Sequence, residues 1–340
     1  MMMYWFTLAL PFYASTQASP GSYLEEHFKV PFQELKTSEL SGGLSASSNY
    51  KVELQGKQYV LRIFPQEESP ETRKREVEAS LYAARLGIAP KIYYVAPRFE
   101  AVLMDFVAGT TLTKKEVEAD DQLSKLLQTI RVLHDSTGDY PKGVTLFEKV
   151  EKELSALLNS DVPLPEVQVR QSIQYLEAIK SAFSGVDLVP CHNDLNALNI
   201  LVSEGQFKLI DWTDAGLGTF YQDLGYFSLV NRIKDLNKLL KLYLQREPTA
   251  DEVEKLNLMR QASKLRLFAT LFASVEPSLS NPEEREKRKA EIVGVLQKKE
   301  ELNLDQYFEM HQKGELNQQV TIFSMALTAL RSFLSEKKEW

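Results

Sequence analysis

The sequence of 340 residues contains a single cysteine, Cys191, and only four histidines. One cysteine excludes an intrachain disulfide, which fits a reducing compartment. So few cysteines and histidines also argue against a zinc site. Apolar residues make up 44% and charged residues 26% of the chain. These ordinary proportions exclude a disordered, collagen-like or disulfide-scaffold protein and favour a globular one of about two domains.

The chain also lacks an excess of positive charge. It has 40 Lys and Arg residues against 47 Asp and Glu residues, so its formal net charge is −7. Nucleic-acid binding depends on phosphate neutralisation by Lys and Arg, so we expect no nucleic-acid partner. A local basic cleft for one phosphorylated ligand remains compatible with this charge.

Long apolar runs are absent except at the start, where residues 1–14 read MMMYWFTLALPFYA. This run is too short to span a membrane comfortably, Pro11 interrupts it, and no Lys or Arg precedes it. We therefore treat residues 1–20 as a tail, with a signal cleaved near Ala18 or a start set too far upstream as alternatives. Membrane contact is expected only through residues 1–14, if at all.

The next part of the chain has the pattern of strands, with one helix. Two β-rich runs flank Gln55-Gly56, which predicts a hairpin. Glu71–Leu86 has apolar residues at helical spacing, and Gly87 follows as its C-terminal cap. The other predicted strands are Phe32–Leu40, Lys91–Ala96 and Glu100–Val107.

Most of the remaining chain has a helical pattern. Predicted helices cover Asp121–His134, Phe147–Leu158, Glu166–Phe183 and nearly everything after Asp223, and a short β island covers Asn199–Val202 and Phe207–Trp212. The sequence thus predicts an α+β protein of two lobes. Residues 21–107 form the small β-rich lobe and residues 108–340 the larger helical lobe.

Polar residues in Val189–Gly225 do not follow a surface pattern. His192, Asp194 and Asn199 lie in a loop before an apolar strand, and Asp211 ends a second apolar strand. A carboxylate at the end of a buried strand must be paired or bind a metal. A phosphoryl-transfer site is the simplest use: Asp194 accepts the proton of an attacking hydroxyl, and the oxygens of Asn199 and Asp211 bind Mg²⁺.

The segments HNDLNALNIL and LIDW resemble the catalytic and metal-binding segments of the aminoglycoside phosphotransferase and choline kinase superfamily. This resemblance implies the two-lobed fold of protein kinases, with ATP and Mg²⁺ as cofactors. It implies that Asp194 is the catalytic base and that Asn199 and Asp211 are the metal ligands. It further implies that His192 and Asp223 brace the catalytic loop.

The N-terminal lobe carries further matches to this superfamily. SGGLSASSNYKV resembles its phosphate-facing loop, which implies phosphate contacts at Gly42, Gly43 and Ser45; taken alone, the two glycines are typical of a plain turn. Arg62 in YVLRIF stands where the family places a base against the α- and β-phosphates, with a solvent-facing Arg as the alternative. Glu76 is its expected partner on the following helix, and Glu78 is the competing choice.

VLMDFVAG resembles the connector between the lobes. The resemblance implies that backbone groups at Asp105 and Val107 meet the adenine edge, and that Met104 borders the pocket as well as packing in the core. We interpret His134 as a packed structural histidine. Cys191 has no basic partner that would indicate a nucleophile.

Two details of the sequence favour different classes of substrate. Asn193 in CHND resembles choline and ethanolamine kinases, whereas Thr213 and Asp214 resemble the antibiotic kinases. A quaternary ammonium would need an aromatic cage, for which Tyr221, Tyr226 and Phe227 are candidates, although helix packing explains them more simply. The charged runs at residues 251–255 and 281–289 fit solvated helix faces better than a pocket for a polycation.

The sequence thus predicts an ATP- and Mg²⁺-dependent kinase acting on a hydroxyl of a small, amine-bearing molecule such as choline, ethanolamine or a thiamine-like alcohol. An aminoglycoside or other antibiotic is the alternative acceptor. A catalytically inactive nucleotide-binding scaffold is the alternative of another class, which the complete set of Asp194, Asn199 and Asp211 argues against. ATP use favours the cytoplasm, with export through the apolar N-terminus as the alternative. The sequence gives no expectation for the oligomeric state.

Overall fold

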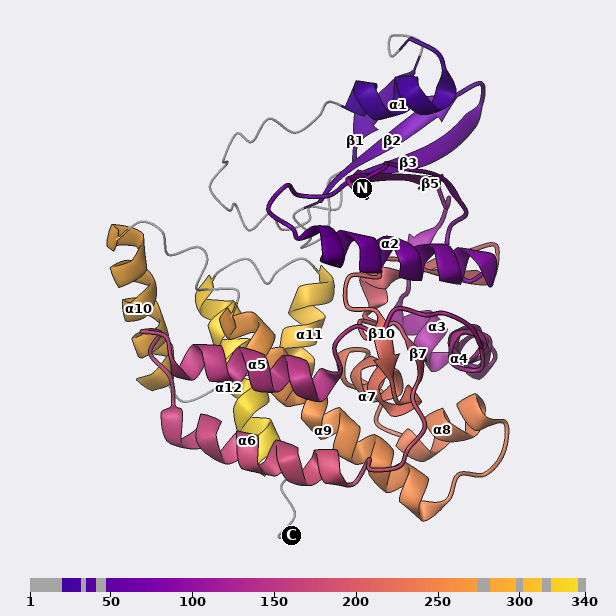
Figure 1. The fold of residues 1–340 in the computed structure, drawn as a ribbon. Coiled ribbons are helices and arrows are strands. Elements are labelled where there is room, and N and C mark those ends of the chain that lie inside the picture. Colours follow the sequence, from indigo (N-terminus) through magenta and orange to yellow (C-terminus); the bar gives the residue numbers. More distant parts are fainter. Residues whose placement is uncertain are drawn as a thin grey trace. The chain divides into compact units, whose positions relative to one another are not determined.

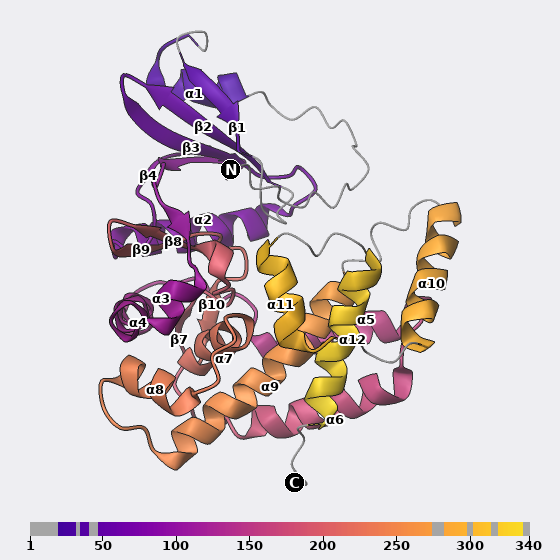
Figure 2. The ribbon, with the colours of Figure 1, turned by 180° about the vertical axis from the view of Figure 1, so that it is seen from behind.

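The computed structural model describes residues 20–31, 35–40, 47–273, 282–297, 302–313 and 319–335. The chain divides into two compact units (Figures 1 and 2). Unit 1 comprises Met1–Gly143 and Val189–Leu217, and unit 2 comprises Val144–Leu188 and Gly218–Trp340. Among the helices that are described, none has the length and apolar character that a membrane crossing requires.

Unit 1 contains a five-stranded antiparallel sheet with the strand order β1-β2-β3-β5-β4. Its hairpin turns at Gln55 and Gly56, whose φ angles of 51° and 78° lie in the left-handed region that glycine adopts readily. The turn sets a register in which Arg62 lies opposite Asn49 on one side and Val102 on the other. The strands are β1 (Lys36–Glu39), β2 (Ser48–Leu54), β3 (Lys57–Ile63), β4 (Ile92–Val95) and β5 (Ala101–Asp105).

A short helix, α1 (Pro20–Phe28), packs on this sheet. Its Leu24 is buried in one cluster with Val52, Leu61 and Leu103, which are inaccessible to solvent. The sequence pattern did not predict this helix. Its nine residues are too few to show a clear period, and most of its stability comes from packing against the sheet.

Helix α2 (Pro70–Arg85) has strong local signals at both ends. The Ser69 side chain accepts a hydrogen bond from the Thr72 amide at 3.1 Å, and Pro70 occupies the first turn. After the helix, Gly87 has φ 75°. The buried face carries Val77, which packs on Phe64 and Val102 of the sheet layer. The same packing buries Glu76, which is unusual for a carboxylate.

The rest of unit 1 combines helices with two small sheets. Helix α4 places its apolar stripe, including Leu127 and Ile130, entirely inside, and contacts β7 and β9. Strands β6, β8 and β9 form one small sheet, and β7 pairs with β10. The elements are β6 (Thr110–Thr111), α3 (Lys114–Glu118), α4 (Asp120–His134), β7 (Val189–Cys191), a 3₁₀ turn (Ala197–Asn199), β8 (Ile200–Ser203), β9 (Gln206–Leu209) and β10 (Gly216–Gly218).

Unit 2 is helical around a central helix, α9. It packs against α5, α6, α7, α8 and α12, and its Phe268 and Phe272 are fully buried together with Phe323 of α12. The helices are α5 (Leu146–Leu158), α6 (Glu166–Ser181), α7 (Phe220–Val230), α8 (Leu236–Leu244), α9 (Ala250–Ala273), α10 (Pro282–Gln297), α11 (Leu304–Lys313) and α12 (Gln319–Ser335).

The structure confirms the predicted fold class, a small antiparallel-sheet lobe with a larger helical part. The two units differ from the predicted lobes, since residues 108–143 and 189–217 group with the N-terminal sheet. One reason is a pair of hydrogen bonds from β9 to the chain after α2: the Leu209 amide donates to the Ile88 carbonyl at 2.7 Å, and the Lys208 ammonium donates to the Gly87 carbonyl at 2.5 Å. The lobe boundary at residue 107 stays a prediction.

Gly109 provides a test of the packing around β6. A Cβ atom at this position would lie 2.2 Å from the Val202 carbonyl oxygen, which belongs to the backbone of β8 and cannot move aside easily. We expect Gly109→Ala to lower the free energy of unfolding by about 1–3 kcal/mol. Gly294→Ala in α10 is the control, because no atom lies within 4 Å of its added Cβ. Equal melting temperatures for the two variants would contradict the packing described here.

Candidate active site

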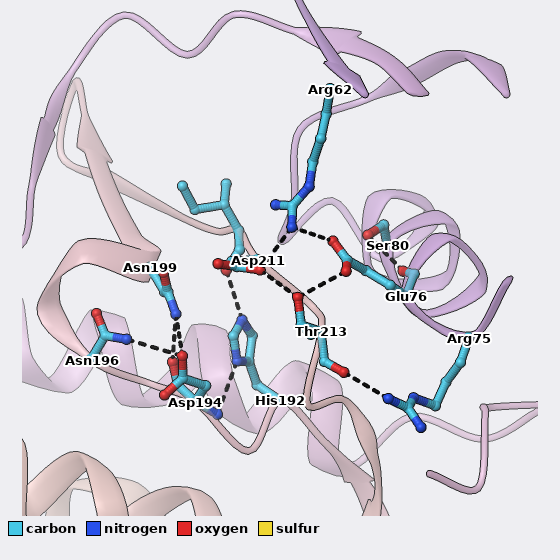
Figure 3. A network of polar contacts seen from close by, with 11 residues as sticks. Arg62, Arg75, Glu76, Ser80, His192, Asp194, Asn196, Asn199, Asp211 and Thr213 are labelled. Carbon is cyan, nitrogen blue, oxygen red and sulfur yellow. Dashed lines mark hydrogen bonds and ion pairs between the residues drawn. The ribbon is translucent and has the colours of Figure 1, made fainter. Parts of the chain in front are cut away.

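The loop that carries Asp194 is built around His192, which follows β7, is completely buried and packs against the Trp212 ring. Its Nδ1 accepts the backbone amide of Asp194 at 3.2 Å. The ring proton therefore sits on Nε2, which donates to the Ile210 carbonyl at 2.9 Å. One neutral ring thus ties the loop that carries Asp194 to the strand end that carries Asp211 (Figure 3).

The Asp194 carboxylate is held by two amide side chains. Asn199 donates from Nδ2 to the Asp194 Oδ2 at 2.8 Å and to its backbone carbonyl at 2.9 Å. Asn196 donates from Nδ2 to the same Oδ2 at 3.1 Å, while its Oδ1 caps the 3₁₀ turn through the Leu198 amide. Both contacts to the carboxylate come from neutral groups, so Asp194 keeps an acceptor oxygen, Oδ1, that neither amide uses.

A second cluster forms where β3, α2 and the end of β9 meet. Arg62 lies 2.9 Å from the Glu76 Oε1 and 3.2 Å from the Asp211 Oδ1 through the same nitrogen, NH2. The Arg62 and Glu76 side chains are 11% and 3% exposed, so both charges are removed from water. The competing candidate Glu78 is instead exposed and pairs with Lys74. One guanidinium therefore faces two carboxylates (Figure 3).

Thr213 joins these groups, a role that sequence reasoning missed. Its hydroxyl lies 2.8 Å from the Glu76 Oε2 and 2.8 Å from the Asp211 Oδ1. Its backbone carbonyl accepts a hydrogen bond from Arg75 of α2 at 3.0 Å. The sequence signal was only that Thr213 departs from the choline-kinase pattern. Asn196 was also missed, although it lies inside the quoted loop motif.

The pKa values of the two carboxylates in this cluster are shifted in opposite directions. Burial alone would raise the pKa of Asp211, but Arg62 and the hydrogen bond from Thr213 outweigh it, so the pKa is lowered and the side chain is an anion at neutral pH. Burial raises the pKa of Glu76 to about 7 despite the attraction of Arg62. A hydroxyl has one proton and can donate to only one carboxylate at a time.

The connector residues lie at the end of β5. The amides of Asp105 and Phe106 are used inside unit 1, by the carbonyls of Lys91 and Gln58. The Asp105 side chain accepts the Tyr93 hydroxyl at 2.8 Å. Met104 packs against the cluster of Phe64, Val77 and Val102, as the packing interpretation predicted.

Several predicted residues are not part of these two clusters. Gly42, Gly43 and Ser45 lie outside the described residues. Asp223 is completely buried in α7 of unit 2, and its bracing role stays a prediction. Tyr221 and Phe227 are buried by packing in unit 2, and the guanidinium of Arg266 lies 4.4 Å from the Tyr226 ring centre. Packing therefore accounts for Tyr221 and Phe227, whereas the partly buried Tyr226 ring already contacts the cation of Arg266.

The donor set fits a magnesium ion. Asn199 uses its amide nitrogen on Asp194, so its Oδ1 is the atom that could bind a metal. Among the described residues, all hydrogen bonds to the Asp211 carboxylate fall on Oδ1, so its Oδ2 could bind a metal as well. A carboxylate and an amide oxygen are hard ligands of the kind that Mg²⁺ prefers.

The raised pKa of Glu76 predicts how stability depends on pH. The folded protein holds a proton on Glu76 up to about pH 7, whereas the ordinary pKa of a glutamate is 4.5. The stabilisation that comes from protonated Glu76 is therefore complete below pH 4.5 and is lost as the pH rises through 7. Over this range the free energy of unfolding falls by an amount on the order of 3 kcal/mol. We expect Glu76→Gln to abolish this decline, measured by denaturant unfolding between pH 4.5 and 8. Glu78→Gln is the matched control, and a Glu76→Gln curve parallel to wild type would contradict the assignment.

Comparison with known families agrees with this geometry. The model of the phosphotransferase enzyme family known as APH matches residues 36–256, well over half of the chain. Protein LicA of Haemophilus influenzae is 25% identical over 211 residues. That match covers 57% of this chain and 56% of LicA, so the chain spans a little over half the length of that relative.

Solved structures share the fold. A choline/ethanolamine kinase family protein of Mesorhizobium loti has a TM-score of 0.60 and 21% identity, covering 87% of this chain and 92% of the other. The choline kinase LicA of Streptococcus pneumoniae has a TM-score of 0.61 and 16% identity, covering 92% and 97%. The match over residues 36–256 includes both clusters described above, and by it the chain belongs to the APH phosphotransferase family.

Proposed function

We propose that this protein transfers the γ-phosphate of ATP to a hydroxyl group of a small, amine-bearing molecule. The observation that carries the proposal is the Asp194 carboxylate, which two neutral amides and the buried His192 hold in one orientation. The APH family match and the resemblance to LicA support the same reaction class.

Asp194 is proposed as the catalytic base. Asn196 and Asn199 both donate to Oδ2. The other oxygen of the same fixed carboxylate, Oδ1, is proposed to accept the proton of the acceptor hydroxyl. His192 fixes the Asp194 backbone, so that the carboxylate need not be reorganised during the reaction.

Asn199 and Asp211 are proposed to hold Mg²⁺, which would neutralise charge on the nucleotide phosphates. Asp211 is suited to this role because its lowered pKa keeps it ionised. Arg62 is proposed to contact the α- and β-phosphates, with Glu76 fixing its guanidinium at 2.9 Å. Phosphoryl transfer needs positioning and charge neutralisation above all, and these residues supply both.

The adenine is proposed to meet the backbone of the connector. The Asp105 amide already donates to Lys91, so the Asp105 carbonyl and the Val107 amide are proposed as the groups that contact the adenine. Gly42, Gly43 and Ser45 are proposed to face the phosphates, and Asp223 to brace the catalytic loop. Residues 21–107 and 108–340 are proposed as the two functional lobes, acting where ATP is available, in the cytoplasm.

The amine-bearing acceptor is proposed because the H. influenzae LicA sequence and the S. pneumoniae choline kinase structure are both similar to this chain. Choline, ethanolamine and thiamine-like alcohols form the first substrate class to test. An antibiotic such as an aminoglycoside is the second candidate, favoured by Thr213 and Asp214 after the metal aspartate. The inactive-scaffold alternative is disfavoured because Arg62, Glu76 and Asp211 form a paired cluster around an ionised carboxylate.

The reaction can be tested by ADP release from ATP and Mg²⁺ against choline, ethanolamine, thiamine, homoserine and several aminoglycosides. We expect one acceptor class to stimulate turnover, and Asp194→Ala to lower kcat on it by about 10²–10⁴-fold, as loss of a general base does. Asp187→Ala, at an exposed aspartate, is the control and should match wild type.

Each result distinguishes the alternatives. Turnover on amino alcohols supports the proposal, and turnover on aminoglycosides alone replaces its substrate class. Binding of ATP with Mg²⁺ but no stimulation by any acceptor would favour the scaffold. Full activity of Asp194→Ala would overturn the assignment of the base.

A further inference from the structure

The side chain of Thr213 contacts both carboxylates of the charged cluster. Its hydroxyl is 2.8 Å from a carboxylate oxygen of Glu76 on α2 and 2.8 Å from one of Asp211, two residues earlier in the chain. The Arg75 bond at 3.0 Å fixes its carbonyl from the same helix. Thr213 is thus held by α2 at both ends, through its side chain and its backbone (Figure 3).

The backbone at Asp211 makes such support useful. Its φ of 63° is uncommon for a residue with a side chain, and surrounding contacts must maintain it. Thr213 and Arg62 both contact the Asp211 Oδ1. Together they orient the carboxylate and leave its second oxygen uncommitted.

Arg62 and Thr213, which both contact Asp211, differ in charge. They therefore act differently on a cation that binds at Asp211. Arg62 is positive and 3.2 Å from Oδ1, so it attracts the carboxylate but repels any cation that binds there. Thr213 is neutral, so it can hold the carboxylate while a cation binds. If a bound metal ion weakened the contact with Arg62, the hydroxyl of Thr213 would still hold Asp211.

We infer that Thr213 is a positioning residue, whose hydroxyl, anchored by α2, orients Asp211 for metal binding. This inference rests on the proposed function in one respect, the assignment of Asp211 as a metal ligand. It adds that the affinity for the metal depends on a neutral hydroxyl that α2 anchors.

The test is a titration with Mn²⁺, which can replace Mg²⁺ and is detected by electron paramagnetic resonance, in the presence of a non-hydrolysable ATP analogue. Removing partners that orient a metal ligand typically costs 10–100-fold in affinity. We expect Thr213→Val to weaken Mn²⁺ binding by about tenfold. Thr213→Ser, which keeps the hydroxyl, should restore most of the affinity.

Two controls separate positioning from general stability. Thr129→Val removes a hydroxyl that bonds only its own helix, to the Lys125 carbonyl, and should leave Mn²⁺ binding unchanged. In turnover assays, Thr213→Val should raise the Mg²⁺ concentration for half-maximal rate more than it lowers kcat. A purely structural role would instead lower the melting temperature without changing the metal affinity.

The outcomes also separate this inference from the proposed function. Asp211→Asn should lose Mn²⁺ binding in either case, and its failure to do so would overturn the metal assignment itself. If Asp211→Asn loses the metal but Thr213→Val binds it like wild type, the role of Thr213 alone is wrong. If Thr213→Val does not fold, a wild-type affinity in Thr213→Ala would likewise overturn it.

Discussion

The site depends on one guanidinium shared between two carboxylates. Arg62 faces Glu76 and Asp211 with little exposure to water, and removing charges from water is costly unless they are paired. Two anions against one cation leave a surplus negative charge. Glu76 rather than Asp211 takes up a proton to reduce this surplus, because the pKa of Glu76 rises to about 7 while that of Asp211 falls. The carboxylate that stays ionised is the one proposed to bind metal.

The loop that carries Asp194, the residue proposed as the base, holds its carboxylate through hydrogen bonds rather than through a charged partner among the contacts described above. The side-chain amides of Asn196 and Asn199 donate to the Asp194 carboxylate, and the ring of His192 accepts the Asp194 backbone amide. The same ring reaches the Ile210 carbonyl, next to Asp211. The buried ring of His192 thus links the backbone at Asp194 to the residue before Asp211 within unit 1, even though 16 residues separate the two aspartates in the sequence. Positioning of this kind is the main contribution a protein makes to phosphoryl transfer.

Much of the architecture was predictable because its signals are local. The hairpin at Gln55-Gly56, the capped helix ending before Gly87 and the apolar stripe of α4 all matched the structure. Helix α1 was not predicted, since its stability comes from packing on a distant sheet. In the site, the choice of Glu76 over Glu78 followed the motif, but the contacts of Thr213 did not, because they join residues 137 positions apart. Sequence spacing cannot show that two residues so far apart in the chain are in contact. For the same reason it cannot show which residues would line a pocket for the acceptor.

The most direct test of the account separates binding from chemistry. Calorimetric titration with a non-hydrolysable ATP analogue and Mg²⁺ should be carried out on wild type, Asp194→Asn and Asp211→Asn, beside turnover measurements on the best acceptor. The account predicts that Asp194→Asn binds the nucleotide and metal like wild type but turns over at least about a hundredfold more slowly. Asp211→Asn should lose metal-dependent binding as well as turnover. Wild-type turnover in either variant, or loss of binding only in Asp194→Asn, would contradict the division of roles between these two carboxylates.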